Sequence, residues 1–595
     1  MREISVPSLV EVDPASNITT LVARTAEQRP DSVAFRRRTA DGWLDVTAAQ
    51  FRDEVVALAK GLVSAGVQPG DRVALMSRTR YEWTLTDLAV WFAGAVTVPV
   101  YETSSPAQVR WILGDSGAVA VVVETPAHRA TVEQVRGEVA GLRHVWEIDA
   151  GALASLVQAG AGVEDAEVER RRSIAGLDDL ATIIYTSGTT GRPKGCELTH
   201  GNFVVLTSNT QARLTQVVSA PGASTLLFLP LAHVFARFVQ VLCLTSGATL
   251  GHTPDVQNLV PDLASYQPTF LLTVPRVFEK IYNSAEQKAE AGGRGKLFRQ
   301  AADVAIAWSR AQDAGGAGLA LRARHALFDR LVYPKVRGAL GGHVQYAVSG
   351  GAALGERLGH FFRGVGLPVL EGYGLTETTA PCCVNVPERV VVGTVGPPLP
   401  GNSVRIADDG EVLVAGPHVF RGYWNNPEAT AEAITDGWFR TGDMGTLDEE
   451  GYLRITGRKK EILITANGKN VAPAVLEDRL RAHPLVSQCI VVGDARPFIA
   501  ALVTLDPDML PTWLKNNGLA QLSVAEAARD ETVQAAVQAA VDDANTAVSR
   551  AESIRKFTIL DTDFTIESGH LTPKLSLRRS EVMKDFAGDV QALYG

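Results

Sequence analysis

The chain has few cysteines, and their spacing suits neither a metal site nor a disulfide framework. It contains five among 595 residues, an odd number with no CxxC pair: Cys196, Cys243, Cys382, Cys383 and Cys489. This pattern argues against a structural zinc site and favours a reducing compartment. We interpret the adjacent Cys382 and Cys383 as packing residues.

A long hydrophobic run is also lacking. The longest apolar stretch, Leu88 to Tyr101, spans 14 residues and contains Thr97 and Pro99, whereas about 18 residues are needed to cross a bilayer. The first residues lack the basic-then-apolar pattern of a signal peptide. We therefore expect a cytoplasmic protein. The absence of a membrane span leaves peripheral contact with the inner face of the membrane open as an alternative.

The chain has no excess of positive charge. Its 57 Lys and Arg against 66 Asp and Glu give a formal net charge of −9, so nothing in the overall charge points to nucleic acid. Residues 280–337 are the exception, with 11 basic and 5 acidic side chains. These residues are either solvated helical faces or a surface for an anionic partner, such as coenzyme A or an anionic bilayer.

What the chain does contain is the composition of a globular protein, with 46% hydrophobic and 21% charged residues. Apolar runs at Arg72–Met76, 119–123 and 225–229 read as strands. The stretch from Phe51 to Ala65, closed by Gly66, reads as a helix between them. This alternation predicts a large α/β domain of stacked, mostly parallel sheets with helical crossovers.

The pattern changes near Gly457. Short strands at 462–465, 489–493 and 498–505 alternate with helices at about 473–482 and 524–548. We predict an N-terminal domain over residues 1–456 and a small α+β domain over 457–595. Because no Pro- or Ser-rich linker separates them, the boundary suggests a hinge and a mobile cap.

The strongest motif is Tyr185-Thr-Ser-Gly-Thr-Thr-Gly-Arg-Pro-Lys-Gly195, which follows the apolar run 180–184. Its glycines expose backbone N–H groups, and its hydroxyl and basic side chains add further donors, as in loops that cradle phosphates. It is not a Walker A loop, because Pro193 stands before Lys194.

This loop resembles the phosphate loop of the adenylate-forming enzymes. Five further segments match that superfamily's motifs in the same order, so the likeness covers essentially the whole chain; they are 229–235 (LPLAHVF), 349–353 (SGGAA), 372–378 (GYGLTET), 437–443 (GWFRTGD) and 457–473 (GRKKEILI onward). Within the superfamily, the chain looks most like bacterial long-chain fatty-acyl-CoA synthetases.

The resemblance implies ATP, Mg²⁺ and coenzyme A as cosubstrates and cofactor, and it assigns residues to them. Glu377 is the only carboxylate of its loop and suits Mg²⁺ as a hard oxygen ligand, and the resemblance makes Thr186 its partner. It places ATP against a set of loop residues: Thr186, Ser187, Gly188, Thr189, Thr190, Gly191, Lys194, Gly351, Ala352, Tyr373, Gly374 and Thr376. Asp443 would accept from the ribose hydroxyls, as the acidic residue of dinucleotide folds does, with Arg458 nearby.

The acyl group is expected beside His233. The superfamily has an aromatic residue or histidine here, next to the acyl carbonyl, with Phe235 near the mouth of an acyl tunnel. The alternative interpretation is a core histidine whose hydrogen bonds are made within the protein.

The adenylating lysine is displaced in this sequence. Long-chain synthetases have Thr-Pro-x-Leu-Lys near the C-terminus, and this chain has Thr572-Pro-Lys-Leu-Ser576. In strict register the catalytic position is Ser576, and we expect Lys574 to serve instead, from the same side of an extended segment. Slow adenylation, or another register with a different base, are the alternatives.

The implied reaction has two half-reactions. A fatty acid and ATP give acyl-AMP and pyrophosphate, and coenzyme A then displaces AMP after rotation of the cap about Gly457. Gly468 would then line the pantetheine path. The alternatives are a fatty-acyl-AMP ligase that delivers to a carrier protein, and a catalytically weak adenylate-binding or acyl-binding homologue.

Overall fold

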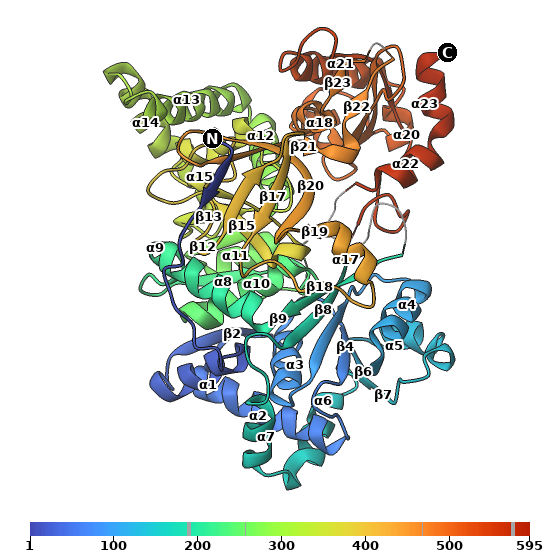
Figure 1. Cartoon of the computed structure of the whole chain (residues 1–595). Coiled ribbons are helices and arrows are strands. Elements are labelled where there is room, and N and C mark those ends of the chain that lie inside the picture. The colour runs from blue at the N-terminus through green and yellow to red at the C-terminus, as the bar shows by residue number, and fades with distance from the viewer. Residues whose placement is uncertain (187–191, 256–257, 467, 573–576) are drawn as a thin grey trace.

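The chain folds into a large N-terminal domain of mixed sheets and helices and a smaller C-terminal domain, as predicted (Figure 1). This computed structural model describes residues 1–186, 192–255, 258–466, 468–572 and 577–595. Three hydrophobic cores draw their buried residues from Ile18 to Leu453, and two others draw theirs from Val471 to Leu593. No core in the described part mixes the two sets, and the predicted boundary at residue 456 lies between them.

The largest sheet leads to the phosphate motif. Its strands run in the order β18-β9-β8-β5-β4-β6-β7, and β8, β5, β4, β6 and β7 are parallel. β9 and β18 are antiparallel additions at one edge. The bounds are β4 (Arg72–Met76), β5 (Val96–Val100), β6 (Ala118–Val123), β7 (His144–Glu147), β8 (Leu180–Thr186), β9 (Lys194–Thr199) and β18 (Gly422–Tyr423).

Two four-stranded sheets complete the parallel part of the domain. Each has three parallel strands and one antiparallel edge strand. The first has the order β10 (Ser224–Leu227), β11 (Thr249–His252), β2 (Val33–Thr39), β3 (Gly42–Thr47). The second has the order β12 (Phe270–Thr273), β13 (Tyr346–Ser349), β14 (Val369–Leu375), β15 (Ala380–Val384).

An antiparallel sheet lies next to the C-terminal domain. Its order is β1-β16-β17-β20-β19, with β21 paired to β20. The strands are β1 (Glu3–Ser5), β16 (Ser403–Ile406), β17 (Glu411–Ala415), β19 (Ile434–Thr435), β20 (Trp438–Leu447) and β21 (Leu453–Arg458). Gly457, the predicted hinge, therefore lies inside β21, opposite Met444.

Helices connect and cover these strands. The predicted helix 51–65 is α2 (Ala48–Ser64), whose start is fixed by a capping box between Thr47 and Gln50 and whose end precedes Gly66 at φ +86°. The other principal helices of the domain are α1 (Ile18–Gln28), α3 (Tyr81–Phe92), α4 (Pro106–Ser116), α5 (Pro126–Glu133), α6 (Ala152–Ala159), α7 (Asp165–Arg172), α8 (His200–Arg213), α10 (Val234–Ser246), α11 (Leu259–Tyr266), α16 (Glu356–Gly364) and α17 (Pro427–Ala433).

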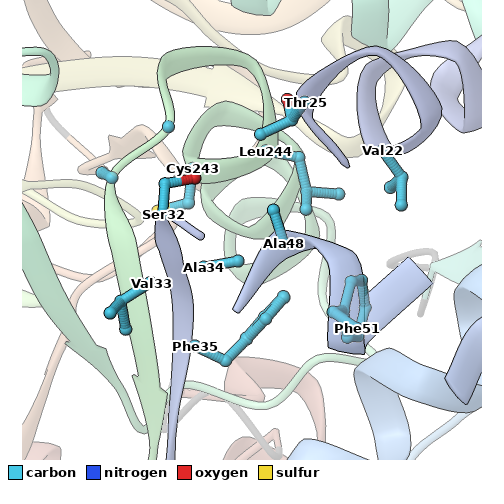
Figure 2. A pocket seen from close by; sticks show the side chains of 12 residues that line it. Val22, Thr25, Ser32, Val33, Ala34, Phe35, Ala48, Phe51, Cys243 and Leu244 are labelled. Atoms are coloured by element: carbon cyan, nitrogen blue, oxygen red, sulfur yellow. The ribbon is translucent and has the colours of Figure 1, made fainter. Parts of the chain in front are cut away.

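A small apolar pocket lies between α1, β2, α2 and the end of α10. Figure 2 shows Val22, Phe35, Phe51 and Leu244 around it. Its enclosed volume is about 20 Å³, roughly the space of one water molecule. The pocket is therefore too small to hold a fatty acyl chain.

The basic segment 280–337 is helical, as expected. It comprises most of α12 (Pro275–Ala291), α13 (Gly295–Asp313), α14 (Leu319–Leu331) and α15 (Tyr333–Gly338). Gly293, Gly315 and Gly316 have positive φ in the turns, where glycine avoids the steric penalty of a side chain.

The C-terminal domain is α+β. Its strands are β22 (Leu463–Ile464), β23 (Asn470–Val471), β24 (Val486–Val492), β25 (Ile499–Leu505) and β26 (Ile554–Ile559), and its helices are α18 (Pro473–Arg481), α19 (Leu510–Asn516), α20 (Val524–Ala527), α21 (Glu531–Asn545), α22 (Arg579–Asp585) and α23 (Ala587–Tyr594). The single helix expected over 524–548 is wrong. Asp530 caps a new helix there by accepting from the backbone of Thr532 and Val533, so α20 ends before α21 begins.

Candidate active site

The phosphate motif joins β8 to β9 as an antiparallel pair. Thr186 lies opposite Lys194 in the register, and its hydroxyl donates to the Lys194 carbonyl at 3.5 Å. The ammonium of Lys194 lies 4.9 Å from the ring centre of Tyr423, which belongs to β18. The other predicted phosphate ligands lie outside the described residues: Ser187, Gly188, Thr189, Thr190 and Gly191.

Glu377 reaches the same place from a different part of the chain. It lies in a short 3₁₀ turn, Thr376–Thr378, and its carboxylate accepts a hydrogen bond from the Tyr423 phenol at 2.9 Å. The thiol of Cys196 on β9 lies near both Glu377 and Thr186: burial and the Glu377 charge raise the thiol pKa, and a hydrogen bond with Thr186 opposes them. The fold therefore brings together the two predicted metal ligands.

The donor set fits a magnesium ion that arrives with phosphates. Glu377 offers a carboxylate and Thr186 a hydroxyl, the hard oxygens that Mg²⁺ prefers. Within the described ranges, no cluster of three or more His, Cys, Asp or Glu side chains could hold a metal ion unaided. Mg²⁺ commonly takes only one or two protein ligands and completes its shell with water and substrate phosphate oxygens.

A second group of predicted residues meets at the junction of β14, β20 and β21. The Tyr373 phenol donates to one oxygen of Asp443 at 2.6 Å, and Arg458 Nε lies 3.2 Å from the other. Asp443 is 3% exposed, and burial, together with the charge of Asp443, raises the pKa of Tyr373 well above its usual value. A buried carboxylate between a phenol and a guanidinium suits the recognition of paired hydroxyls.

Gly374 has a packing role. At Gly374, where β14 changes register, an added Cβ would lie 1.5 Å from the Ala380 carbonyl oxygen of β15. Only glycine fits at this position, so packing against β15 explains the glycine without any contact to a ligand. Thr376 begins the turn that carries Glu377, and its carbonyl accepts from the Thr379 backbone.

Gly351 and Ala352 lie in the exposed loop after β13, and Gly351 has φ +83°. The preceding residue, Gly350, faces Phe235: a Cβ there would lie 3.5 Å from the ring. The loop predicted to contact ATP and the residue predicted at the mouth of the acyl tunnel are thus neighbours.

His233 is the N-cap of α10. Its Nδ1 accepts from the Phe235 backbone N–H at 3.2 Å. In the neutral ring, an accepting Nδ1 leaves the proton on Nε2. The half-buried side chain therefore has a structural role as a helix cap.

The described residues on either side of the C-terminal lysine motif pack in the core of the C-terminal domain. Lys574 and Ser576 lie outside the described residues, but Leu571 and Leu577 pair as an antiparallel bridge on either side of them. Further along, Arg579 forms an ion pair of 2.6 Å with Glu477 on α18.

Comparison with known proteins identifies the family. AMP-binding enzymes match residues 22–424, and the AMP-binding enzyme C-terminal domain matches residues 460–595. The chain belongs to the AMP-binding enzymes.

Its relatives include ligases of fatty acids. A long-chain-fatty-acid–CoA ligase of Mycobacterium bovis is 52% identical over 100% of both chains. Long-chain-fatty-acid–CoA ligase 1 of Homo sapiens is 31% identical over 91% of this chain and 82% of its own. The crystal structure of an anthranilate CoA ligase in complex with anthranoyl-AMP has the same fold, with a TM-score of 0.75 at 19% identity over 97% of this chain and 99% of that one.

The two domains of this AMP-binding enzyme touch where α12 meets α19 and the segment before it. Arg276 on α12 forms an ion pair of 3.0 Å with Asp506, and Lys280 forms one of 3.3 Å with Asp508. Gln287 of α12 accepts from Asn516 at 2.8 Å. These contacts join the C-terminal domain to α12.

Gly468 lies in the turn between β22 and β23. Its φ is +75°, and an added Cβ would meet nothing within 4 Å. The positive φ favours glycine there. In this orientation of the C-terminal domain, no described neighbouring group would clash with a larger side chain.

Sequence reasoning missed Glu371. This β14 carboxyl group is 8% exposed and accepts from the Leu354 backbone at 3.0 Å. Burial raises its pKa to about 7, and the charge of Asp478 on α18 of the cap adds to the rise. The only sequence signal was an acidic residue ending an apolar run, which says nothing about a partner a hundred residues away.

The Arg237–Asp87 pair was missed as well. Both side chains are fully buried, with Arg237 Nη2 2.6 Å from Asp87 on α3 and Nη1 2.5 Å from Thr182 on β8. The guanidinium lies over the rings of Trp83 and Trp91. Arg237 therefore ties the helix that His233 caps to the strand that leads to Thr186. An arginine inside an otherwise apolar helix was the available signal.

Proposed function

We propose that this AMP-binding enzyme is a long-chain fatty acid–CoA ligase, with medium-chain acids as further substrates. The acid's carboxylate attacks the α-phosphorus of ATP, releasing pyrophosphate and forming acyl-AMP. The thiol of coenzyme A then displaces AMP to form acyl-CoA. The observation that carries this proposal is the 52% identity over the full length to a ligase named for this activity, and the two side-chain clusters above support it.

In this proposal the phosphates lie at the β8–β9 loop. Thr186 and Glu377 would hold Mg²⁺, which would neutralise phosphate charge when bound. Lys194 is the basic side chain of this cluster in the described residues, 4.9 Å from the Tyr423 ring that faces Glu377. Positive charge placed there stabilises the charge that develops as pyrophosphate leaves.

Adenosine is proposed to lie between the Gly351–Ala352 loop and Tyr373, with its ribose hydroxyls on Asp443. Arg458 already pairs with that carboxylate across β20 and β21. His233 would donate from Nε2 to an oxygen of the acyl carboxylate or phosphate, since its Nδ1 is engaged as a helix cap.

The cap is proposed to serve the two half-reactions in turn. Lys574 would reach the α-phosphate in the first. Rotation about Gly457 would withdraw it and bring Gly468 toward the pantetheine chain in the second. Gly457 has φ +154°, outside the range that other residues readily adopt in a strand. The domain boundary at residues 456 and 457 is part of this proposal.

Partners beyond the small-molecule substrates are proposed on charge. We propose that the enzyme has no nucleic acid partner. We also propose that it is cytoplasmic and contacts an anionic membrane through residues 280–337. Helices in the described ranges are all too short or too polar to span a bilayer, so any such contact would be peripheral.

An assay of AMP release over a series of fatty acids tests the function. We expect AMP and acyl-CoA only when ATP, Mg²⁺, coenzyme A and a fatty acid are all present. Pyrophosphate release without thioester formation would point instead to a carrier-protein ligase, and ADP formation would contradict the mechanism. Absence of fatty-acid-dependent pyrophosphate release would leave a binding homologue.

A further inference from the structure

Helix α14 is fixed to the protein by one face only. On that face Phe328 is 6% exposed, and His325 stacks on Trp308 of α13 with ring centres 4.2 Å apart. The His325 Nε2 also lies 2.7 Å from the Gly364 carbonyl oxygen of α16. Figure 1 shows α13 and α14 at the edge of the molecule, beyond the sheets of the N-terminal domain. The opposite face of α14 therefore points away from the body of the protein.

That outward face is apolar along its centre. Leu319 is 84% exposed, Leu327 54% and Leu331 51%. Their spacing of eight and four residues puts them within about a third of a turn of one another on an α-helix. Ala320, Ala323 and Ala326 are also exposed on this helix. A row of exposed leucines rimmed by polar groups marks an interaction surface.

Basic side chains surround the leucines. Arg322, Arg324 and Arg330 of α14 are exposed, as is Lys335 just beyond it. Among the ion pairs of the described residues, none involves these four side chains. Asp329, the one carboxylate of α14, lies 2.8 Å from Arg337. The outward face, defined by Leu319, Arg322, Arg324, Leu327, Arg330 and Leu331, thus combines apolar side chains with positive charge that has no carboxylate partner on the helix.

This combination selects among anionic partners. A nucleic acid would pair with the arginines but leave the leucines against water or phosphate. A second copy of the same face would bring arginine against arginine. The surface of an anionic bilayer satisfies both parts, because leucines enter the headgroup–acyl boundary while arginines meet lipid phosphates.

We propose that the outward face of α14 docks the enzyme on the surface of an anionic lipid bilayer, with the helix lying in the interface. This proposal rests on the proposed function only in explaining why docking is useful: it would give the enzyme access to a fatty acid that partitions into membranes. The binding itself depends on α14 and on the lipid charge.

Vesicle sedimentation tests the docking. The probes are vesicles of phosphatidylcholine, with and without 30 mol% phosphatidylglycerol, at low salt. One variant carries Leu319→Gln, Leu327→Gln and Leu331→Gln, and another carries Arg322→Gln, Arg324→Gln and Arg330→Gln. The control replaces three exposed arginines on other surfaces, Arg24, Arg550 and Arg555, by glutamine and so has the same net charge as the second variant.

We expect the wild type and the control to bind anionic vesicles and not neutral ones. Loss of three basic residues should lower the partition coefficient by about 100-fold, and loss of the leucines should lower it at least about tenfold. Circular dichroism and thermal melting establish that each variant is folded. Equal vesicle binding by the wild type and both α14 variants, or no binding by the wild type, would overturn the proposal.

Activity with decanoate in vesicle-free solution separates this proposal from the proposed function. We expect both α14 variants to keep wild-type activity there, since α14 contributes no residue to the candidate active site. If the wild type binds vesicles through α14 but forms no acyl-CoA, the proposed function fails while the docking stands.

Discussion

The Tyr373 phenol donates a hydrogen bond to the Asp443 carboxylate across a distance of 2.6 Å. The two residues are 70 positions apart, on β14 and β20 of different sheets, and the tertiary fold brings their side chains together. Arg458 approaches the other carboxylate oxygen. Asp443 is thus held in one orientation before any nucleotide arrives, which lowers the ordering cost of binding.

Replacing Asp443 by asparagine should weaken nucleotide binding. Loss of a charged hydrogen-bond acceptor costs about 1.5–3 kcal/mol, or roughly 10- to 100-fold in the Kd for AMP, measured by isothermal titration calorimetry. Tyr373→Phe keeps the ring and removes only the hydroxyl, so we expect a smaller effect. An unchanged Kd in Asp443→Asn would remove this residue from the site.

Lys574 and Ser576 can be separated by mutation. If Lys574 carries the adenylating charge, Lys574→Ala should lower the rate of acyl-AMP formation by about 100-fold or more, while Ser576→Ala stays near wild type. Pyrophosphate exchange measures this step. Thioester formation from preformed acyl-AMP is the internal control, because the second half-reaction does not need the lysine. Wild-type exchange in Lys574→Ala would show that another base is used.

Glu371 should make stability depend on pH. Burial holds its pKa at about 7 in the folded protein, against an ordinary value of 4.5. The folded state therefore binds more protons than the unfolded state between these pH values, so this carboxyl lowers stability as pH rises from about 5 to above 7, by about 3 kcal/mol at most.

Urea unfolding at pH 5 and pH 8 checks this. Glu371→Gln should lose less stability than the wild type over that range, because glutamine does not titrate. Glu388→Gln, on the surface, is the control and should behave like the wild type. Parallel pH profiles for the Glu371 variant and the wild type would contradict the assignment.

Arg276 is expected to hold the cap in its observed orientation. It is 16% exposed and pairs with Asp506, which is 7% exposed. Arg276→Gln should release the cap, and limited proteolysis near residues 457–468 should become about tenfold faster, as for the loss of about 1.5 kcal/mol. Lys280→Gln removes the exposed neighbouring pair with Asp508 and should change little. Equal cleavage rates for Arg276→Gln and the wild type would argue against this role.

Removing one partner of the Arg237–Asp87 pair should lower the free energy of unfolding strongly, whereas replacing both partners should lower it less. Either Arg237→Met or Asp87→Leu alone leaves a buried charge unpaired and should cost about 3–5 kcal/mol of unfolding free energy, whereas the double variant should recover part of it. Arg36–Asp45, an exposed pair, should contribute less than about 1 kcal/mol. Additive losses in the double variant would show that the two residues act independently.

The sequence by itself determined the α/β architecture, the order of the motifs and many of the strands, because hydrophobic alternation, caps and glycine-rich turns are local properties. It also singled out Thr186, Glu377, Tyr373 and Asp443. It could not place the break between α20 and α21, where one capping aspartate outweighed a continuous helical pattern.

Only the tertiary structure decided which of these residues meet. The contact of Tyr423 with Glu377, the approach of Asp478 to Glu371 and the ion pair of Arg276 with Asp506 join segments 46, 107 and 230 positions apart. It also decided which face of α14 turns outward, because packing against Trp308 and Gly364 fixes the helix rotation. Such pairings depend on the path of the whole chain, and no short stretch of sequence specifies them.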